Sequence, residues 1–182
     1  LDGDGDHDAL TADYNGDTVS VLKNDGSGNF SDSGQTLGVG SEPALADLDG
    51  DGDLDVLGTT NLALNNGSRV FNNTGLNLPG NTASVGDLDG DGDNDVVVGL
   101  LTGSVEAVRG LVWFENDGRG EFVEREISTA LKDIKHIWSA DMDNDFRRDL
   151  VVIGTEIVEV FDPVYGWAED ALGSTMVAWY KN

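Results

Sequence analysis

Residues 47–55 read Asp-Leu-Asp-Gly-Asp-Gly-Asp-Leu-Asp and lead directly into the apolar pair Val56 and Leu57. Five carboxylates in nine residues repel one another in a folded chain unless a cation lies among them. A close copy, Asp-Leu-Asp-Gly-Asp-Gly-Asp-Asn-Asp, occupies residues 87–95 and continues into three valines. A looser copy spans residues 141–149, and the chain opens with Leu-Asp-Gly-Asp-Gly-Asp-His-Asp at residues 1–8. In chain order we call these stretches the first, second, third and fourth loops, the units of an internal repeat.

Composition restricts the partners of the chain. Its 182 residues are 38% hydrophobic, which is enough for a core and unlike a disordered segment. The net charge of -25 arises from 35 acidic and 10 basic residues, and it argues against binding to nucleic acid or to anionic membrane surfaces. No apolar run approaches the roughly 20 residues of a membrane span, so no membrane insertion is expected. The four loops hold 18 of the 35 acidic residues, and the expected partners are therefore divalent cations.

The loops recur at a spacing typical of repeat architectures. The first aspartates of the second, third and fourth loops are 40 and 54 residues apart, in the range of solenoids and propellers. An unbroken aliphatic run leaves each loop, as expected of a strand buried on both faces. A further apolar segment then precedes a glycine-containing turn, such as Asn116-Asp117-Gly118, which favours a hairpin.

Each period therefore contains about four short strands, the unit of a propeller blade. No segment has a convincing helical period, and residues 121–135 are interpreted as strand plus loop. The sequence predicts an all-β protein made of about four β-propeller blades, each of up to four antiparallel strands, as part of a larger propeller. The expected blades are residues 1–37, 41–80, 82–132 and 134–182.

Alternating aspartates are suited to calcium. Calcium takes six to eight oxygen ligands in flexible geometry, and glycines between the aspartates allow the backbone to curl around the ion. An EF-hand would place a bidentate glutamate at position twelve and a helix after it. Position twelve here is Gly58, Val98 or Val152, and a strand-like run follows, so the EF-hand is excluded.

The pattern Asp-x-Asp-Gly-Asp-Gly-x-x-Asp, followed by an aliphatic strand and an Asn-Asp-Gly-x-Gly-x-Phe hairpin, resembles the FG-GAP/VCBS repeat family. That family includes the calcium-bearing blades of integrin-like β-propellers, and the resemblance covers essentially the whole chain. It implies that calcium is bound by the side chains at positions 1, 3, 5 and 9 and by the backbone carbonyl at position 7. The implied ligands are Asp47, Asp49, Asp51, Asp53 and Asp55 in the second loop, and Asp87, Asp89, Asp91, Asp93 and Asp95 in the third.

The first loop departs from this pattern because it lacks position 1. It retains Asp2, Asp4, Asp6 with its carbonyl, and Asp8, so an incomplete and weak site is expected.

The fourth loop keeps the aspartates but changes their surroundings. Phe146 replaces a glycine, and a positive φ there would cost on the order of 1 kcal/mol or more. Arg147 and Arg148 add positive charge beside the carboxylates, which predicts either weaker calcium binding or a loop braced by Arg–Asp pairs. The carboxylates concerned are Asp141, Asp143, Asp145 and Asp149. We therefore expect about two strong calcium sites and up to four in all.

Four aromatic side chains allow two interpretations each. His136 and Trp138 share a strand face where other repeats have Glu42 and Ala44, or Thr82 and Ser84; the pair marks either a ligand site or packing specific to one blade. Trp113 and Trp179 recur at matching repeat positions, which favours packing between blades over sugar stacking.

No nucleophile–base pair, phosphate-binding loop or dinucleotide fingerprint is found in the sequence, and calcium ligation explains the carboxylates better than acid–base catalysis. We expect a non-catalytic extracellular adhesion or binding module with a protein or glycan ligand and structural calcium. The terminal blades would leave open edges that favour self-association. The alternatives are a portion of a propeller-fold polysaccharide lyase or hydrolase, and a purely structural segment.

Overall fold

The computed structural model describes residues 1–67, 70–100, 110–127, 131–142, 144, 148–156, 158–162, 166–170 and 175–180. These residues form antiparallel strands and no helix, and hence no helix that could cross a membrane. The prediction of an all-β chain with several small antiparallel sheets, as in part of a β-propeller, is confirmed.

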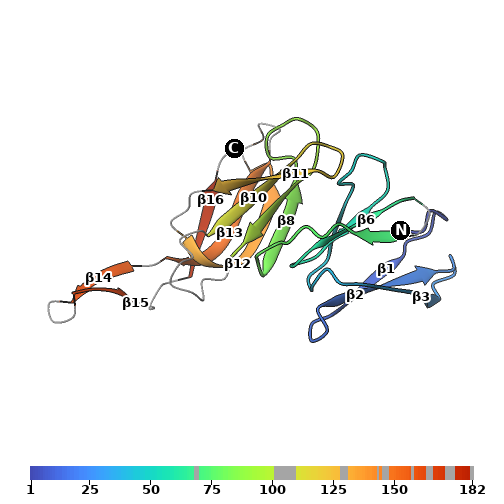
Figure 1. Cartoon of the computed structure of the whole chain (residues 1–182), viewed down its shortest axis with the longest axis horizontal. Helices are drawn as coiled ribbons and strands as arrows, with labels where there is room; N and C mark the ends of the chain where they lie inside the picture. The colour runs from blue at the N-terminus through green and yellow to red at the C-terminus, as the bar shows by residue number, and fades with distance from the viewer. Residues whose placement is uncertain are drawn as a thin grey trace.

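Four sheets follow one another along the chain (Figure 1). The first contains β1 (Ala9–Asp13), β2 (Thr18–Asn24) and β3 (Phe30–Leu37). The second contains β4 (Ala44–Ala46), β5 (Asp55–Leu57), β6 (Leu62–Asn65) and β7 (Phe71–Asn73). The third contains β8 (Thr82–Gly86), β9 (Asp95–Gly99), β10 (Leu111–Asn116) and β11 (Phe122–Ile127). The second and third sheets pair their strands in chain order, which is the four-stranded unit expected of a blade.

The fourth sheet has an insertion. It pairs β12 (Leu131–Ala140), β13 (Asp149–Glu156) and β16 (Thr175–Tyr180). Between β13 and β16 the chain forms a separate ribbon of β14 (Val158–Asp162) and β15 (Gly166–Asp170), which stands apart from the four sheets in Figure 1. The repeat pattern did not predict this ribbon, because it contains neither an acidic loop nor a glycine turn of the repeated kind.

Hydrophobic core lies between each pair of successive sheets. On β9, Val96 and Val98 join the core that the second and third sheets share, whereas Val97 joins the core between the third and fourth sheets. On β5, Leu57 joins the core between the second and third sheets, and Val56 joins the core between the first and second sheets. Because alternate residues of a strand point to opposite faces, these aliphatic runs are buried on both faces, as the sequence predicts.

Trp113 lies in the interface between blades that the sequence favours for it. It packs against the core between the third and fourth sheets. Its strand, β10, pairs Trp113 with Val97, and β16 pairs Trp179 with Val151 in the same way. The predicted correspondence of the two tryptophans is therefore confirmed in the backbone register.

Candidate metal centre

The second loop connects β4 to β5 and the third connects β8 to β9, so each joins the first two strands of its sheet. In both loops the glycines at positions 4 and 6 have positive φ, 74° and 89° in the second loop and 83° and 101° in the third. Glycine adopts this region without steric cost, and two such residues curl the chain back toward the strand that leaves the loop. The sequence thus folds the alternate aspartates into one turn.

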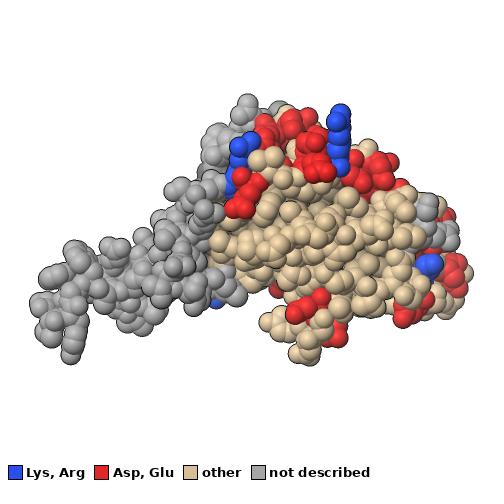
Figure 2. All heavy atoms as spheres, viewed as in Figure 1, with Lys and Arg blue, Asp and Glu red and all other residues tan. Residues whose placement is uncertain are grey.

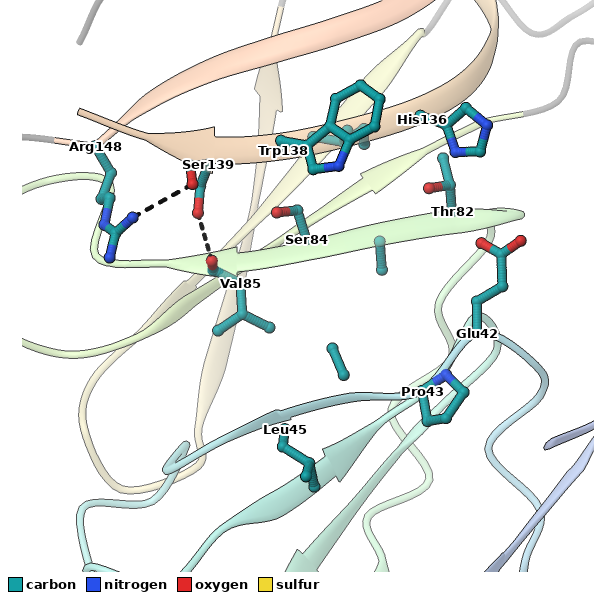
Figure 3. Close-up of a pocket in the computed structure, with 13 residues that line it drawn as sticks. Glu42, Pro43, Leu45, Thr82, Ser84, Val85, His136, Trp138, Ser139 and Arg148 are labelled. Carbon is teal, nitrogen blue, oxygen red and sulfur yellow. Dashed lines mark hydrogen bonds between the residues drawn. The ribbon is translucent and has the colours of Figure 1, made fainter. Parts of the chain in front are cut away.

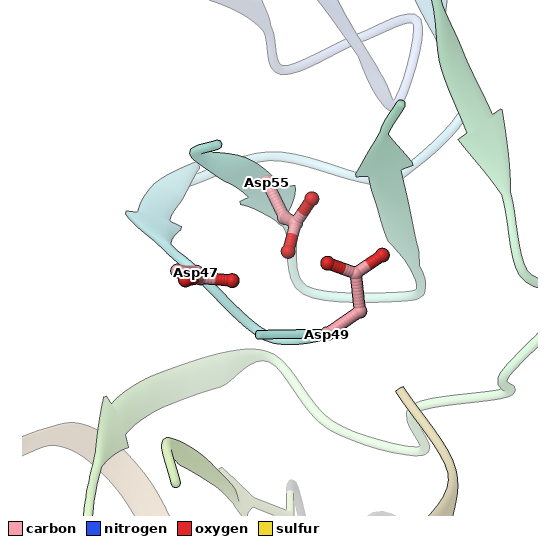
Figure 4. Close-up of side chains that lie close together, drawn as sticks. All are labelled: Asp47, Asp49 and Asp55. Atoms are coloured by element: carbon pink, nitrogen blue, oxygen red, sulfur yellow. The ribbon is translucent and has the colours of Figure 1, made fainter. Parts of the chain in front are cut away.

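Three carboxylates converge inside the second loop (Figure 4). Asp47, Asp49 and Asp55 each offer an oxygen, and these oxygens lie within 4.8 Å of one another. Calcium holds its ligands at 2.3–2.6 Å, so two ligands of one ion can be at most about 4.6–5.2 Å apart. The third loop repeats the cluster with Asp87, Asp89 and Asp95. In donor type and spacing both clusters fit a calcium ion.

The remaining two aspartates of each loop lie outside the three-carboxylate cluster. The Asp51 carboxylate accepts a hydrogen bond from the Asp53 amide at 2.9 Å, and Asp91 accepts one from Asp93 at 3.0 Å. The Asp53 side chain lies against Gly67 of the hairpin turn, where a Cβ would collide with its carboxylate. In the third loop the corresponding contact joins Asp93 and Gly118. Position 7 therefore points its side chain at the hairpin rather than into the cluster.

Backbone amides hold the carboxylates in place. The position-1 carboxylate of Asp47 accepts hydrogen bonds from Gly50 and Gly52 at 2.8 and 3.0 Å. At position 9, the two oxygens of Asp55 accept from the amides of Leu48 and Asn65, each at 2.7 Å. The third loop repeats all four bonds, with Asp87 accepting at 2.7 and 3.1 Å and Asp95 at 3.0 and 2.9 Å. We call the two bonds to the position-9 aspartate the loop frame.

Two asparagines connect neighbouring blades. The Asn116 side-chain amide donates to Asn94 of its own loop and to Leu48 of the second loop, both at 2.8 Å. Asn65 likewise donates to Leu54 of its own loop at 3.3 Å and to Leu1 of the first loop at 3.2 Å. We call Asn65 and Asn116 the bridging asparagines. The backbone amide of each asparagine also donates to the position-9 aspartate of its own loop. Each bridging asparagine therefore connects its own acidic loop to the acidic loop of the preceding blade.

Comparison with known families decides the affiliation of the chain. The model of the FG-GAP-like repeat matches residues 1–58 and 87–152. The chain belongs to the FG-GAP-like repeat family. The two matched ranges contain all four acidic loops, so each is a loop of an FG-GAP-like repeat. Searches of the curated proteins and of the solved structures found no match.

The electrostatics of the two complete FG-GAP loops favour an added positive charge. Burial raises the pKa of Asp55 to about 6, and the charges of Asp49 and Asp51 act in the same direction, against the hydrogen bonds from Asn65 and Leu48. Burial also raises the pKa of Asp95. The carboxylates at position 3, Asp49 and Asp89, have raised pKa values too, because of burial and the neighbouring aspartates. A cation among these groups would relieve the repulsion that raises them.

The first FG-GAP loop has the frame without the cluster. Asp8, at position 9, accepts from the Asn24 amide at 3.0 Å and from the Asp2 amide at 3.0 Å, and it pairs with the Leu1 amino group at 2.9 Å. Asp4 and Asp6 donate their amides to the preceding aspartates of the loop, as in the complete loops. Within the described ranges, the only groups of three convergent acidic ligands are those of the second and third loops.

The fourth FG-GAP loop is described in part. Asp143, Asp145, Phe146 and Arg147 lie outside the described residues. Asn144 takes the place of the position-4 glycine with a φ of 61°, a conformation that asparagine tolerates better than most residues. Buried Asp149 accepts from the Met142 amide at 3.0 Å, which preserves this half of the loop frame. Arg148 donates to the Ser139 carbonyl at 3.3 Å, and Asp141 lies at the start of the loop.

His136 and Trp138 occupy another part of the fold. Both project from β12 into a groove that the first strands of three successive sheets line (Figure 3). Their rings stack with centroids 5.5 Å apart and planes inclined by 25°. Thr82 and Ser84, which the repeat alignment places at equivalent positions, line the same groove, as does Glu42.

Proposed function

We propose that this chain is a calcium-stabilised FG-GAP propeller module that presents a binding surface and has a structural, non-catalytic role. One observation carries the proposal: the same three-carboxylate cluster forms twice, at equivalent places in two successive blades. In each case the position-9 aspartate of the cluster also accepts hydrogen bonds from one backbone amide of the loop and one of the hairpin. An ion at either cluster would therefore act on the loop and on the strand pairing of its blade together.

The residues proposed to hold the two ions are Asp47, Asp49 and Asp55, and Asp87, Asp89 and Asp95. Calcium would supply positive charge that lets these carboxylates remain ionised, although all of them except Asp89 are partly or fully buried. Asp51 and Asp91, and the carbonyls of Asp53 and Asp93, complete the ligand set that the family resemblance implies. The bridging asparagines would then transmit the ordering of one loop to the next blade through the Leu48 and Asn94 carbonyls.

The proposed setting is extracellular, with adhesion or ligand binding as the biological role. Calcium modules outside cells work at affinities down to the millimolar range, which suits loops with several exposed ligands. Figure 2 shows acidic side chains gathered along the top edge, with further groups at the right and lower edges, whereas the broad visible surface between them is uncharged. Self-association through the edges of the terminal sheets belongs to the same proposal, because unpaired strand edges favour pairing with another chain.

Thermal unfolding with calcium and then with chelator tests this function. Two strong sites at a calcium concentration 100 times the dissociation constant would each add about 2.7 kcal/mol to the unfolding free energy. The midpoint should rise in calcium for the native chain and rise much less for the double variant Asp47→Asn, Asp87→Asn. An unchanged midpoint in the native chain would refute the structural role of calcium, and calcium-dependent cleavage of a polysaccharide would refute the non-catalytic role.

A further inference from the structure

A groove of about 480 Å³ lies where three sheets meet, away from the acidic clusters. It is lined by β8, β12 and the segment around β4, which are the first strands of their sheets and lie at the sheet edges. The repeat places Glu42, Thr82 and His136 at one position of these strands, and Ala44, Ser84 and Trp138 two residues later. All six line the groove (Figure 3). Its volume is within the range of about 300–1,000 Å³ that is usual for small-ligand sites.

β12 is irregular immediately before the aromatic pair. The pairing of β12 with β13 shifts register between Lys132 and His136, where β12 has extra residues. Inside the irregular segment, Ile134 is fully buried between the third and fourth sheets, and its backbone bonds to Leu100 and Asn81. After it, Ile137 is buried, whereas His136 and Trp138 are exposed. Bulges of this kind re-aim side chains and are enriched near binding sites.

The aromatic pair does not act as packing between blades. Trp138 is 49% exposed, and the residues at the equivalent positions of the neighbouring first strands, Ala44 and Ser84, are small. A tryptophan that filled a blade interface would be largely covered, as Trp113 is. The small residues at the equivalent positions instead leave open volume, and the imidazole stacks on the indole. The result is an aromatic surface open to solvent.

Glu42 adds a strained backbone at the opposite side of the groove. Its φ is 53°, a region that residues other than glycine, asparagine and aspartate rarely adopt. Such strain is found preferentially at ligand sites, where the surrounding structure holds a side chain in a required position. The Glu42 carboxylate lies on the side of the groove near Thr82 and His136 (Figure 3).

The charge of the groove selects the class of ligand. Among the residues that line it, Glu42 is the only acid and Arg148 the only arginine or lysine, in a chain whose net charge is -25. A polyanion would meet the negative field of the whole molecule without a basic cluster to hold it. An exposed indole surrounded by a carboxylate, a guanidinium and two hydroxyls suits a ligand with an apolar face and several hydroxyl groups.

We propose that this groove binds a neutral saccharide, which stacks a sugar face on Trp138 and hydrogen-bonds through its hydroxyls to Glu42 and Ser84. This inference rests on the proposed binding function of the module and names its ligand class. A peptide added as an extra strand fits less well, because the Ser139 hydroxyl donates to the Val85 carbonyl at 2.6 Å and occupies the edge of β8 facing β12. Arg148 bonds to the Ser139 carbonyl beside it.

Binding of the calcium-loaded chain to an array of neutral oligosaccharides tests the proposal. The array carries glucans, mannans, xylans and galactans beside polyuronates, and the strongest neutral hit is then titrated in solution by calorimetry. We expect saturable binding that Trp138→Ala weakens at least tenfold, Glu42→Gln weakens severalfold and Trp138→Phe partly retains. Val123→Ala, which changes an exposed residue of β11 outside the groove, should bind like the native chain.

Each variant is first melted with calcium and with chelator, so that loss of binding is separated from loss of folding. Absence of binding to every neutral glycan by a calcium-responsive chain would overturn the saccharide site and leave the calcium function intact. Binding to polyuronates alone, or native affinity in Trp138→Ala, would also overturn it. If calcium does not stabilise the native chain, the proposed function fails whatever the array shows.

Discussion

The first loop and the third loop share a frame but differ in their carboxylate cluster. In both, the position-9 aspartate accepts one hydrogen bond from a backbone amide of the loop and one from the backbone amide of an asparagine, Asn24 at the end of β2 or Asn116 at the end of β10. Only the third loop adds a carboxylate at position 1, Asp87, and there three acidic oxygens converge. In these two loops the bonds to position 9 form in both cases, and the three-oxygen cluster is found in the loop that has a carboxylate at position 1.

The largest expected effect on stability comes from removing the position-9 aspartate, which belongs both to the loop frame and to the carboxylate cluster. Asp95→Ala deletes a fully buried carboxylate and leaves the Leu88 and Asn116 amides without their acceptor. Loss of these bonds should lower the unfolding free energy by about 2–5 kcal/mol, and the calcium response of this loop should vanish. Urea unfolding in calcium and in chelator measures both.

The matched variant in the first loop sharpens the comparison. Asp8→Ala should also destabilise the chain, but by the same amount with calcium as with chelator. Asp93→Ala, at position 7, serves as the control in the third loop because its side chain lies outside the cluster. A calcium-dependent loss in Asp8→Ala would contradict the separation of frame and metal site.

The next effect is a pH dependence that calcium should suppress. The pKa of Asp55 is raised from 3.8 to about 6, so the folded state holds this proton more tightly than the unfolded state. Its contribution to stability is complete below pH 3.8 and is lost as the pH rises through about 6. With chelator, the unfolding free energy should therefore fall between pH 5 and 7 by on the order of 1 kcal/mol, and with calcium by less.

Asp55→Asn is the control for this titration, since it removes the proton without removing the side-chain carbonyl. The variant in chelator should lose the part of the slope between pH 5 and 7 that Asp55 contributes, while Asp95, whose pKa is also raised, keeps its own part. A slope as steep as that of the native chain would assign the pH dependence to other groups.

A smaller effect is expected at the bridging asparagines. Asn116→Ala removes three side-chain hydrogen bonds: one donated to its own loop, one donated to the second loop and one accepted from the Gly118 amide. It should cost about 1–3 kcal/mol. Asn24→Ala in the first sheet also removes three bonds, to the His7 carbonyl and from the Gly26 and Gly28 amides, but all three are exposed and none reaches another sheet, so it should cost less. Hydrogen exchange of the Leu48 region is the discriminating measurement: protection there should fall in Asn116→Ala and remain in Asn24→Ala.

The smallest expected effect is at a loop glycine. Gly92 has a φ of 101°, and an alanine there should cost on the order of 1 kcal/mol and weaken calcium binding. Gly5→Ala, at the equivalent position of the first loop with a φ of 94°, should cost a similar amount without affecting calcium. Gly38→Ala is the control, because its backbone φ is not positive and a Cβ would meet open space. Thermal melts and calcium titrations of the three variants check the order.

Sequence reasoning predicted the repeated elements well. The resemblance to FG-GAP repeats implied that Asp47, Asp49 and Asp55 serve one site, and their oxygens lie within 4.8 Å of one another. The valine run after Asp95 indicated a strand buried on both faces. The role of Asn116 was not predicted. Its side-chain amide donates to the carbonyl of Leu48, which is 68 residues away in the sequence. In the sequence, Asn116 was interpreted only as the first residue of a hairpin turn.

Features specific to one blade were the least predictable. The extra residues before His136 follow from the burial of Ile134 between two sheets, a tertiary contact that strand alternation does not encode. The alternation did place His136 and Trp138 on one face, but whether that face was covered depended on the small side chains of β4 and β8. Two signals in the sequence could have pointed to these features. An asparagine at the start of each hairpin turn marks a bridging residue, and a break in the apolar alternation marks an irregular strand.

Calcium stoichiometry is the most direct test of the central claim that position 1 completes the metal site. Calorimetric titration of the chelator-stripped chain at pH 7.5 should show two strong sites, and Asp87→Asn should retain one, with its lost site at least tenfold weaker. Asp93→Asn should retain both. Two unchanged sites in Asp87→Asn, or no calcium binding by the native chain, would contradict the account.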